Sequence, residues 1–260
     1  EYRRQRQMCI RDRILALWFV LYTLIQNGTI TNYWSGILIT VGINIILATS
    51  LNVATGYLGQ LPLGHAGFMA VGAYAGGIFM KAVPVQELLK SGNTGAAIPY
   101  ILLALLISAV VAGIFGILIG IPALRLRGDY LAIVTLGFGL IVENVIANLP
   151  FAGGDGLASG TASSSLYANG LGLSTSLQAK YVWLVLGITV LCIALMCMFI
   201  RSKYGRAIEA IRDDEIAAAA SGVNTTYYKI LTFVISAFFA GLAGGLYALS
   251  LIHISEPTRL

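Results

Sequence analysis

Few ionisable side chains lie within the apolar stretches of this sequence, and these are the first candidates for chemistry. His65 lacks the nearby cysteine, carboxylate or second histidine that a metal site would need, so we interpret it as an interfacial histidine with satisfied hydrogen bonds. Glu143 could relay protons or bind an ion. Because no second charged side chain is placed to pair with it, we favour a hydrogen bond between helices instead.

Motifs for covalent or nucleotide chemistry are absent from the sequence. It contains no GxxxxGK phosphate loop, no GxSxG nucleophile elbow and no HExxH zinc motif. We therefore expect that the chain is not an enzyme and needs no cofactor or metal. What remains are polar residues that could line a path for a solute. These candidates are Asn52, Gln60, His65, Asn144 and Asn148.

The segment 201–226 concentrates charge between two apolar stretches. Its Ala, Ile, Glu and Arg content favours a helix, which we expect from Ala207 to Ala219. Gly222 is placed to cap the end of this helix, and Asn224 or Thr225 to cap the start of the next. A short amphipathic helix with both signs of charge suits docking into a groove of a partner protein. The alternative is a solvated connector.

The amino-acid composition indicates the class of protein to which these residues belong. Of the 260 residues, 58% are hydrophobic and 10% are charged, whereas soluble domains carry about 25% charged residues. The apolar content excludes disorder, and three cysteines are an odd set that does not suit a disulfide scaffold. Since a spanning helix needs about 20 apolar residues, the chain has room for about seven. The sequence predicts an all-α fold, a polytopic transmembrane helical bundle.

One short and six fuller apolar stretches are the candidate spans. The short stretch, Ile14–Ile25, would rise only about 18 Å as a helix, less than the roughly 30 Å of a bilayer core. It is either a truncated span or one that the following polar residues complete. The fuller stretches are Tyr33–Ala54, Leu61–Met80, Pro99–Ile121, Tyr130–Leu149, Tyr181–Ile200 and Tyr228–Ser250.

The third span is expected to be broken. From Gly56 to Gly67 the sequence places four glycines, a proline, a glutamine and a histidine. Such backbone is tolerated in lipid only where it is buried in protein or lines a cavity, and transporters use discontinuous helices near their substrates. The alternative is that the glycines allow close helix packing, which we favour for Gly72 and Gly76.

Basic residues predict the orientation of the spans. Counting crossings from a cytoplasmic N-terminus places two basic loops inside and leaves only Lys81, Lys90 and Lys180 outside, as the positive-inside rule requires. The long loop 150–180 then lies outside and the charged segment 201–226 lies inside. The basic residues of the inside loops are Arg125, Arg127, Arg201, Lys203, Arg206, Arg212 and Lys229.

Both ends of the chain differ from its middle. Residues 1–13 and 251–260 resemble translated sequencing-adapter sequence, and we expect them to be non-native tails around a membrane domain of residues 14–250. Without their six basic and three acidic residues, the formal net charge of +5 falls to +2. The basic charge therefore indicates no nucleic-acid partner.

Four stretches occur together and in order: 51–74 around Gly56-Tyr57-Leu58-Gly59-Gln60, then 126–139, the glycine turn 153–157, and 205–224. They resemble the LivM-type permeases of branched-chain amino acid ABC importers, and the resemblance covers about residues 33–250. The chain departs from this family at Leu140, where an acid is usual, and at Glu143, where a base is frequent.

The resemblance implies a multi-pass permease subunit in the bacterial inner membrane. Two permeases, commonly a heterodimer, would sit on two cytoplasmic ATPases, and a periplasmic binding protein would deliver Leu, Ile or Val. The segment 201–226 would be the coupling loop that docks on the ATPase. The coupling residues by resemblance are Gly205, Arg206, Glu209, Ala210, Arg212, Asp213, Glu215 and Gly222.

Other functions stay open from the sequence. Importers of urea, amides and other amino acids share these motifs, so the substrate is undecided. An ion-coupled secondary transporter would need no ATPase and would depend on Glu143. An intramembrane enzyme is disfavoured because paired catalytic residues are absent.

Overall fold

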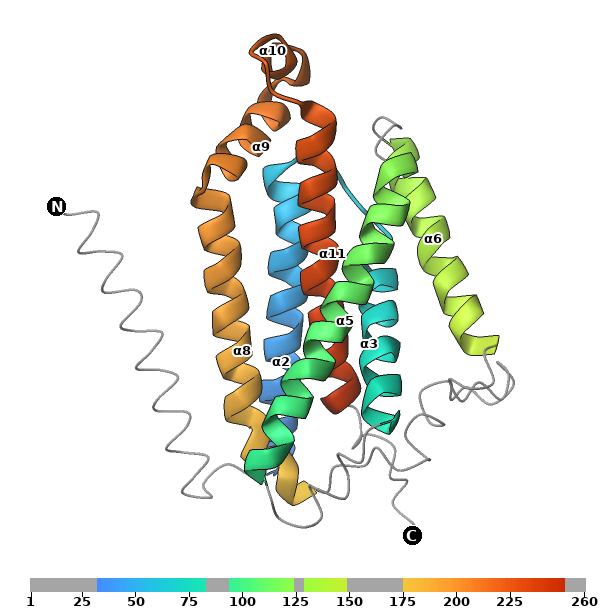
Figure 1. Cartoon of the computed structure of the whole chain (residues 1–260), viewed down its shortest axis with the longest axis vertical. Helices are drawn as coiled ribbons and strands as arrows, with labels where there is room; N and C mark the ends of the chain where they lie inside the picture. The colour runs from blue at the N-terminus through green and yellow to red at the C-terminus, as the bar shows by residue number, and fades with distance from the viewer. Residues whose placement is uncertain (1–31, 83–93, 124–128, 149–174, 251–260) are drawn as a thin grey trace, which may run out of the picture.

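The computed structural model describes residues 32–82, 94–123, 129–148 and 175–250 (Figure 1). All elements in these ranges are helical, which confirms the all-α prediction. The predicted first span and both expected tails lie outside the described residues. The elements are α2 (Asn32–Asn52), the π-helical turn η1 (Val53–Tyr57), α3 (His65–Ala82), α5 (Thr94–Ala123), α6 (Asp129–Asn148), α8 (Thr175–Arg201), α9 (Lys203–Asp213), α10 (Glu215–Ala220) and α11 (Thr225–Ser250).

Six of these elements correspond to the six fuller apolar stretches. Four are long and apolar enough to cross a membrane, over Gly36–Tyr57, Ile98–Pro122, Val182–Arg201 and Thr225–Ala248. Two shorter apolar helices, over His65–Met80 and Tyr130–Val142, belong to α3 and α6. The 18 residues of α3 would rise about 27 Å, close to the thickness of a bilayer core. The protein is a multi-pass membrane protein.

The break in the third span is confirmed, but the helix that follows begins later than expected. α3 starts at His65, whereas the apolar stretch starts at Leu61. Pro62 lacks an N–H and disfavours helical backbone at the residue before it. Gly59 has φ 75°, a left-handed conformation that ends the preceding π turn. The chain therefore crosses from α2 to α3 through the non-helical residues 58–64, which we call the break.

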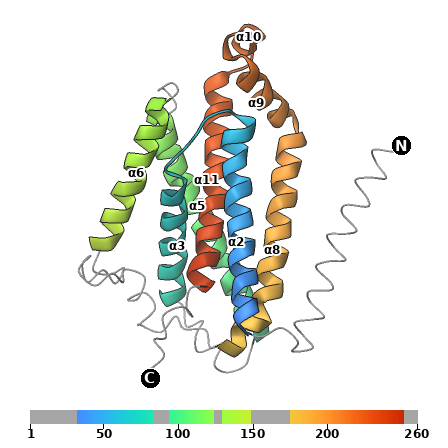
Figure 2. The same ribbon diagram turned by 180° about the vertical axis from the view of Figure 1, so that it is seen from behind.

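Helix α11 runs through the middle of the bundle (Figures 1 and 2). It packs against α2, α3 and α5, while α8 packs on α2 and α6 packs on α3. Helices α2, α5 and α8 run toward the end that carries α9 and α10, and α3, α6 and α11 run away from it (Figure 1). The polypeptide thus alternates direction at each described span, as the predicted topology requires.

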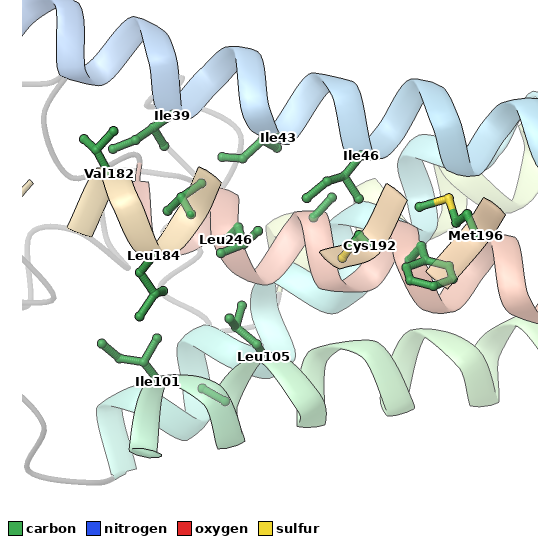
Figure 3. Close-up of a cluster of buried hydrophobic side chains, with 14 of the residues drawn as sticks. Ile39, Ile43, Ile46, Ile101, Leu105, Val182, Leu184, Cys192, Met196 and Leu246 are labelled. Carbon is green, nitrogen blue, oxygen red and sulfur yellow. The ribbon is translucent and has the colours of Figure 1, made fainter. Parts of the chain in front are cut away.

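The largest buried cluster lies where α2, α8, α5 and α11 meet (Figure 3). On α2 the spacing of Ile39, Ile43 and Ile46 places them on one helical face, where they join Val182 of α8 and Leu246 of α11. All five side chains are almost fully buried. This apolar cluster fixes α8 against the central helices.

Glycines bring α3 and α11 into backbone contact. A Cβ at Gly72 would overlap the backbone of Gly241, and a Cβ at Gly76 would overlap the Ser108 hydroxyl of α5. Lipid tails are as apolar as the side chains, so close van der Waals packing has to hold membrane helices together. The close-packing interpretation of Gly72 and Gly76 is confirmed.

Candidate functional site

The charged segment forms a hairpin of two short helices, α9 and α10, at one end of the bundle (Figure 1). The single helix expected from Ala207 to Ala219 is therefore wrong, because the chain turns at Asp214. The backbone of Asp214 is extended, at φ −156° and ψ 112°, and its Oδ1 accepts hydrogen bonds from the amides of Ile216 at 2.8 Å and Ala217 at 3.1 Å. An aspartate before an alanine-rich run is a helix-start signal that could have predicted this turn.

The hairpin leaves the membrane helix α8 through a tight turn. The Oγ of Ser202 accepts a hydrogen bond of 3.2 Å from the Tyr204 amide and so caps α9. Gly205 lies against the backbone of Ile200, where a Cβ would overlap the carbonyl group. A glycine is thus required at the point where α9 folds back on the end of α8.

The end of the hairpin confirms the predicted caps. Gly222 has φ 85°, and the amide of the next residue, Val223, donates a 3.1 Å hydrogen bond to the Ala218 carbonyl. The Oδ1 of Asn224 accepts a 3.2 Å hydrogen bond from the Tyr227 amide at the start of α11. The two predicted choices for this cap are therefore decided in favour of Asn224.

The apolar face of the hairpin packs on the break in the third span. Ile208 and Ile211 of α9 and Ala218 of α10 form one buried cluster with Leu58, the first residue of the break. These four side chains are exposed by 5% or less. Because Leu58 belongs to the connection between α2 and α3, the hairpin is joined directly to the discontinuous part of the bundle.

Polar contacts fix the hairpin to two membrane elements. The Nη1 of Arg212 donates a 2.9 Å hydrogen bond to the carbonyl oxygen of Gly56 in η1. The Nζ of Lys229, on α11, lies 2.6 Å from Oε1 of Glu215, the first residue of α10. The Lys229 side chain is 11% exposed, so it is held in a largely buried position. One contact reaches the break and the other reaches the central helix.

None of the remaining coupling candidates is buried. Arg206 and Ala210 are exposed, Glu209 is half-buried, and Asp213 is exposed and paired with Arg212. Sequence reasoning missed one conspicuous residue on this surface. The side chain of Ile216 on α10 is 83% exposed, and its apolar character among charged neighbours was the signal.

Three of the five candidates for lining a solute path lie at or beside the break. Asn52 is exposed at the end of α2, and its side-chain oxygen fills the space above Gly56, so a Cβ there would overlap it. The backbone amide of Gln60 donates a 3.2 Å hydrogen bond to the Ala54 carbonyl, and its buried side-chain Oε1 makes no hydrogen bond with the described residues. His65 is buried, and its Nε2 lies 2.9 Å from the Ser50 hydroxyl.

The other two path candidates belong to α6 and are not brought to the break. A Cβ at Gly64 would overlap the Thr135 carbonyl, which fixes where α6 passes the break. Asn144 lies nine residues farther along this helix, about 13 Å at the rise of an α-helix. Its Nδ2 donates a 2.8 Å hydrogen bond to the Leu140 carbonyl of the same helix. Asn148 ends α6, and its side chain lies outside the described set, as does that of Glu143.

Comparison with known proteins gives a match to a protein family over most of the chain. The family described as the permease component of the branched-chain amino acid transport system matches residues 33–258. The matched range extends past position 250, and the expectation that residues 251–260 are a non-native tail stays a prediction. No solved structure matches the chain significantly.

Three curated relatives carry the name LivM. The high-affinity branched-chain amino acid transport permease LivM of Salmonella typhimurium is 37% identical over 226 residues, and that of Escherichia coli is 35% identical over the same number. Each alignment covers 79% of this chain and 50% of the relative, so the chain spans about half the length of these two proteins. A probable LivM of Methanocaldococcus jannaschii is 26% identical over 240 residues, covering 85% of this chain and 68% of the relative.

The family match covers most of the described bundle, including the break and the hairpin that packs on it. The protein belongs to the family of permease components of the branched-chain amino acid transport system.

Proposed function

We propose that the protein is a transmembrane permease subunit of an ATP-binding-cassette importer for branched-chain amino acids. In this function it couples ATP hydrolysis by partner ATPases to passage of Leu, Ile or Val. The observation that carries the proposal is the packing of the α9–α10 hairpin on the break, through Ile208, Ile211 and Leu58. A movement of this hairpin would be transmitted through these contacts to the discontinuous span, and transporters of several folds form their substrate sites at such spans.

Charge supports a cytosolic location of the hairpin in the bacterial inner membrane. Lys203 and Arg206 belong to α9 of the hairpin, and Arg201 ends α8 directly before it. The end of α5 and the start of α6 lie at the same end of the bundle as the hairpin (Figure 1) and flank the segment with Arg125 and Arg127. Cytoplasmic loops are enriched in Lys and Arg, and this orientation gives a cytoplasmic N-terminus for seven spans.

The proposed partners are two cytoplasmic ATPases, a second permease subunit and a periplasmic substrate-binding protein. Ile216 offers the ATPase an apolar anchor that is 83% exposed. Arg206 and Asp213 are exposed on the same hairpin and offer charged groups to the partner, while Ala210 leaves room for it. Apolar anchors ringed by polar groups are the usual composition of an interaction hot spot.

The main alternative within the same fold is an importer of urea, amides or other amino acids. A secondary transporter driven by an ion gradient is the alternative from another class, and it would depend on Glu143. The names of the relatives and the hairpin anchored on the break favour the ATP-driven importer.

Reconstitution tests the proposal against both alternatives. The protein is placed in proteoliposomes with the ATPases, second permease and binding protein encoded by neighbouring genes, and uptake of labelled leucine, urea and an amide is measured. We expect leucine uptake that requires internal ATP, the ATPases and the binding protein. Uptake of leucine by the chain alone under an ion gradient, or ATP-driven uptake of urea with none of leucine, would overturn it.

A further inference from the structure

Arg212 is a charged residue of the hairpin whose side chain contacts the turn before the break. It lies in the last turn of α9, and its Nη1 donates the 2.9 Å hydrogen bond to the Gly56 carbonyl, which is 156 positions away in the chain. Its Nε and Nη2 donate to Oδ1 of Asp213 at 3.3 and 3.2 Å. The guanidinium is thus held between its own helix and the π turn.

The acceptor of this hydrogen bond is the exposed end of a helix. The last carbonyl groups of a helix have no partner within it, and they carry the negative end of the helix dipole. Gly56 is the penultimate residue of η1. In a continuing helix its carbonyl would accept a hydrogen bond from the amide of Gln60 or Leu61, but both residues belong to the non-helical break. A guanidinium is matched to such a carbonyl in both charge and hydrogen bonding.

Gly59 makes room for the aliphatic part of the same arginine. A Cβ at Gly59 would lie 3.0 Å from Cγ and 4.0 Å from Cβ of Arg212. Gly59 also needs its positive φ of 75°, which a glycine adopts at no steric cost. The stem of Arg212 therefore packs on the break while its head binds the turn before it.

We propose that Arg212 is an internal positioning residue that ties the hairpin to the break, so that the two move as one body, rather than a contact with the partner ATPase. The inference rests on the proposed function. Leu58 supplies the apolar contact between the hairpin and the break. Arg212 supplies a directional hydrogen bond to the Gly56 carbonyl and packs its stem on Gly59. Without Arg212, the hairpin can still dock on its partner, but its motion reaches α3 only in part.

A disulfide that replaces the arginine tests this role. The expected 4.0 Å between the two Cβ positions lies within the range of about 3.5–4.5 Å for disulfides. We therefore combine Gly59→Cys with Arg212→Cys in a protein whose three natural cysteines are replaced. Disulfide formation is followed by loss of maleimide labelling, and leucine uptake and ATP hydrolysis are measured in the reconstituted importer.

If Arg212 ties the hairpin to the break, a disulfide at the same place should restore coupling. We expect the reduced double variant, and Arg212→Gln alone, to retain the ATPase subunits on purification and to hydrolyse ATP, with leucine uptake per ATP at least fivefold lower. Because a cysteine at position 59 is strained at φ 75°, the oxidised double variant is compared with its own reduced form, and oxidation should raise uptake per ATP at least twofold. In the two single variants, Arg212→Cys and Gly59→Cys, oxidation should not change leucine uptake per ATP.

Several results would overturn the inference. These are a disulfide that does not form, one that forms without restoring uptake per ATP, or normal coupling in Arg212→Gln. Loss of the ATPase subunits from Arg212→Gln would make the residue a partner contact instead. If the parent itself shows no ATP-driven uptake, the proposed function fails. Maleimide labelling of the cysteine pair still reports whether positions 59 and 212 are in contact.

Discussion

The hydroxyl of Ser236 on α11 donates a 2.8 Å hydrogen bond to the backbone carbonyl of Ser50 on α2. The Ser50 hydroxyl lies 2.9 Å from Nε2 of His65, the first residue of α3. The Ser50 hydroxyl also lies 2.9 Å from the Leu47 carbonyl oxygen, to which it donates in the tautomer with a proton on Nε2 of His65. Helices α2, α3 and α11 are therefore linked by buried polar contacts.

Replacing Ser50 by Ala should destabilise the protein. The change removes the partner of the buried His65 ring nitrogen, and a buried polar atom without a partner costs about 1–3 kcal/mol. Thermal unfolding in detergent, followed by tryptophan fluorescence, should show a lower midpoint. Thr49→Ala is the matched control because, within the described ranges, the Thr49 hydroxyl bonds only to the carbonyls of Ile45 and Ile46 in its own helix. Equal midpoints for the two variants would contradict the importance of the link.

Replacing Gly72 by Ala should separate α3 from α11. The added Cβ would overlap the Gly241 backbone, and such overpacking costs about 1–3 kcal/mol. We expect a lower unfolding midpoint in detergent and reduced leucine uptake. Gly137→Ala on α6 is the control, since a Cβ there meets no atom of the described residues within 4 Å. The better helix propensity of Ala, worth up to about 1 kcal/mol in the free energy of unfolding, should leave the midpoint unchanged or slightly higher.

The ion pair between Glu215 and Lys229 should couple α10 to α11. Glu215 is 44% exposed, so solvent screens the pair and we expect an interaction energy of about 1 kcal/mol or less. A double-mutant cycle with Glu215→Gln and Lys229→Met, measured by unfolding in detergent, gives this energy. It should shrink at high salt. A cycle with zero interaction energy at low salt would show that the contact does not hold the hairpin.

Replacing Ile216 by Ser should weaken binding of the ATPase subunits. Full burial of an isoleucine side chain contributes about 1.5–3 kcal/mol, which corresponds to about a 10- to 150-fold change in affinity. Because Ile216 is 83% exposed, its loss should leave the unfolding midpoint unchanged. Titration of the purified ATPase on the permease in nanodiscs measures the affinity. An unaltered dissociation constant would place the docking surface elsewhere.

Apolar stretches and local capping signals were sufficient to predict the elements themselves. The six fuller stretches each became a helix, Gly222 and Asn224 cap where expected, and Pro62 marks the break. These features depend on a residue and its immediate neighbours in the chain, so the sequence determines them. The turn at Asp214 has the same local origin and was overlooked rather than hidden.

Contacts between distant segments required the tertiary structure. Arg212 was expected to serve a partner protein, yet its side chain binds the carbonyl of Gly56, and Gly72 meets Gly241. A helical pattern specifies which residues share a face, but which two faces meet depends on how all the helices pack together. In a membrane this packing rests on shape and on small residues more than on hydropathy, and hydropathy is what the apolar stretches record. The sequence therefore determined the spans and their ends, and the packed bundle decided that the hairpin rests on the break.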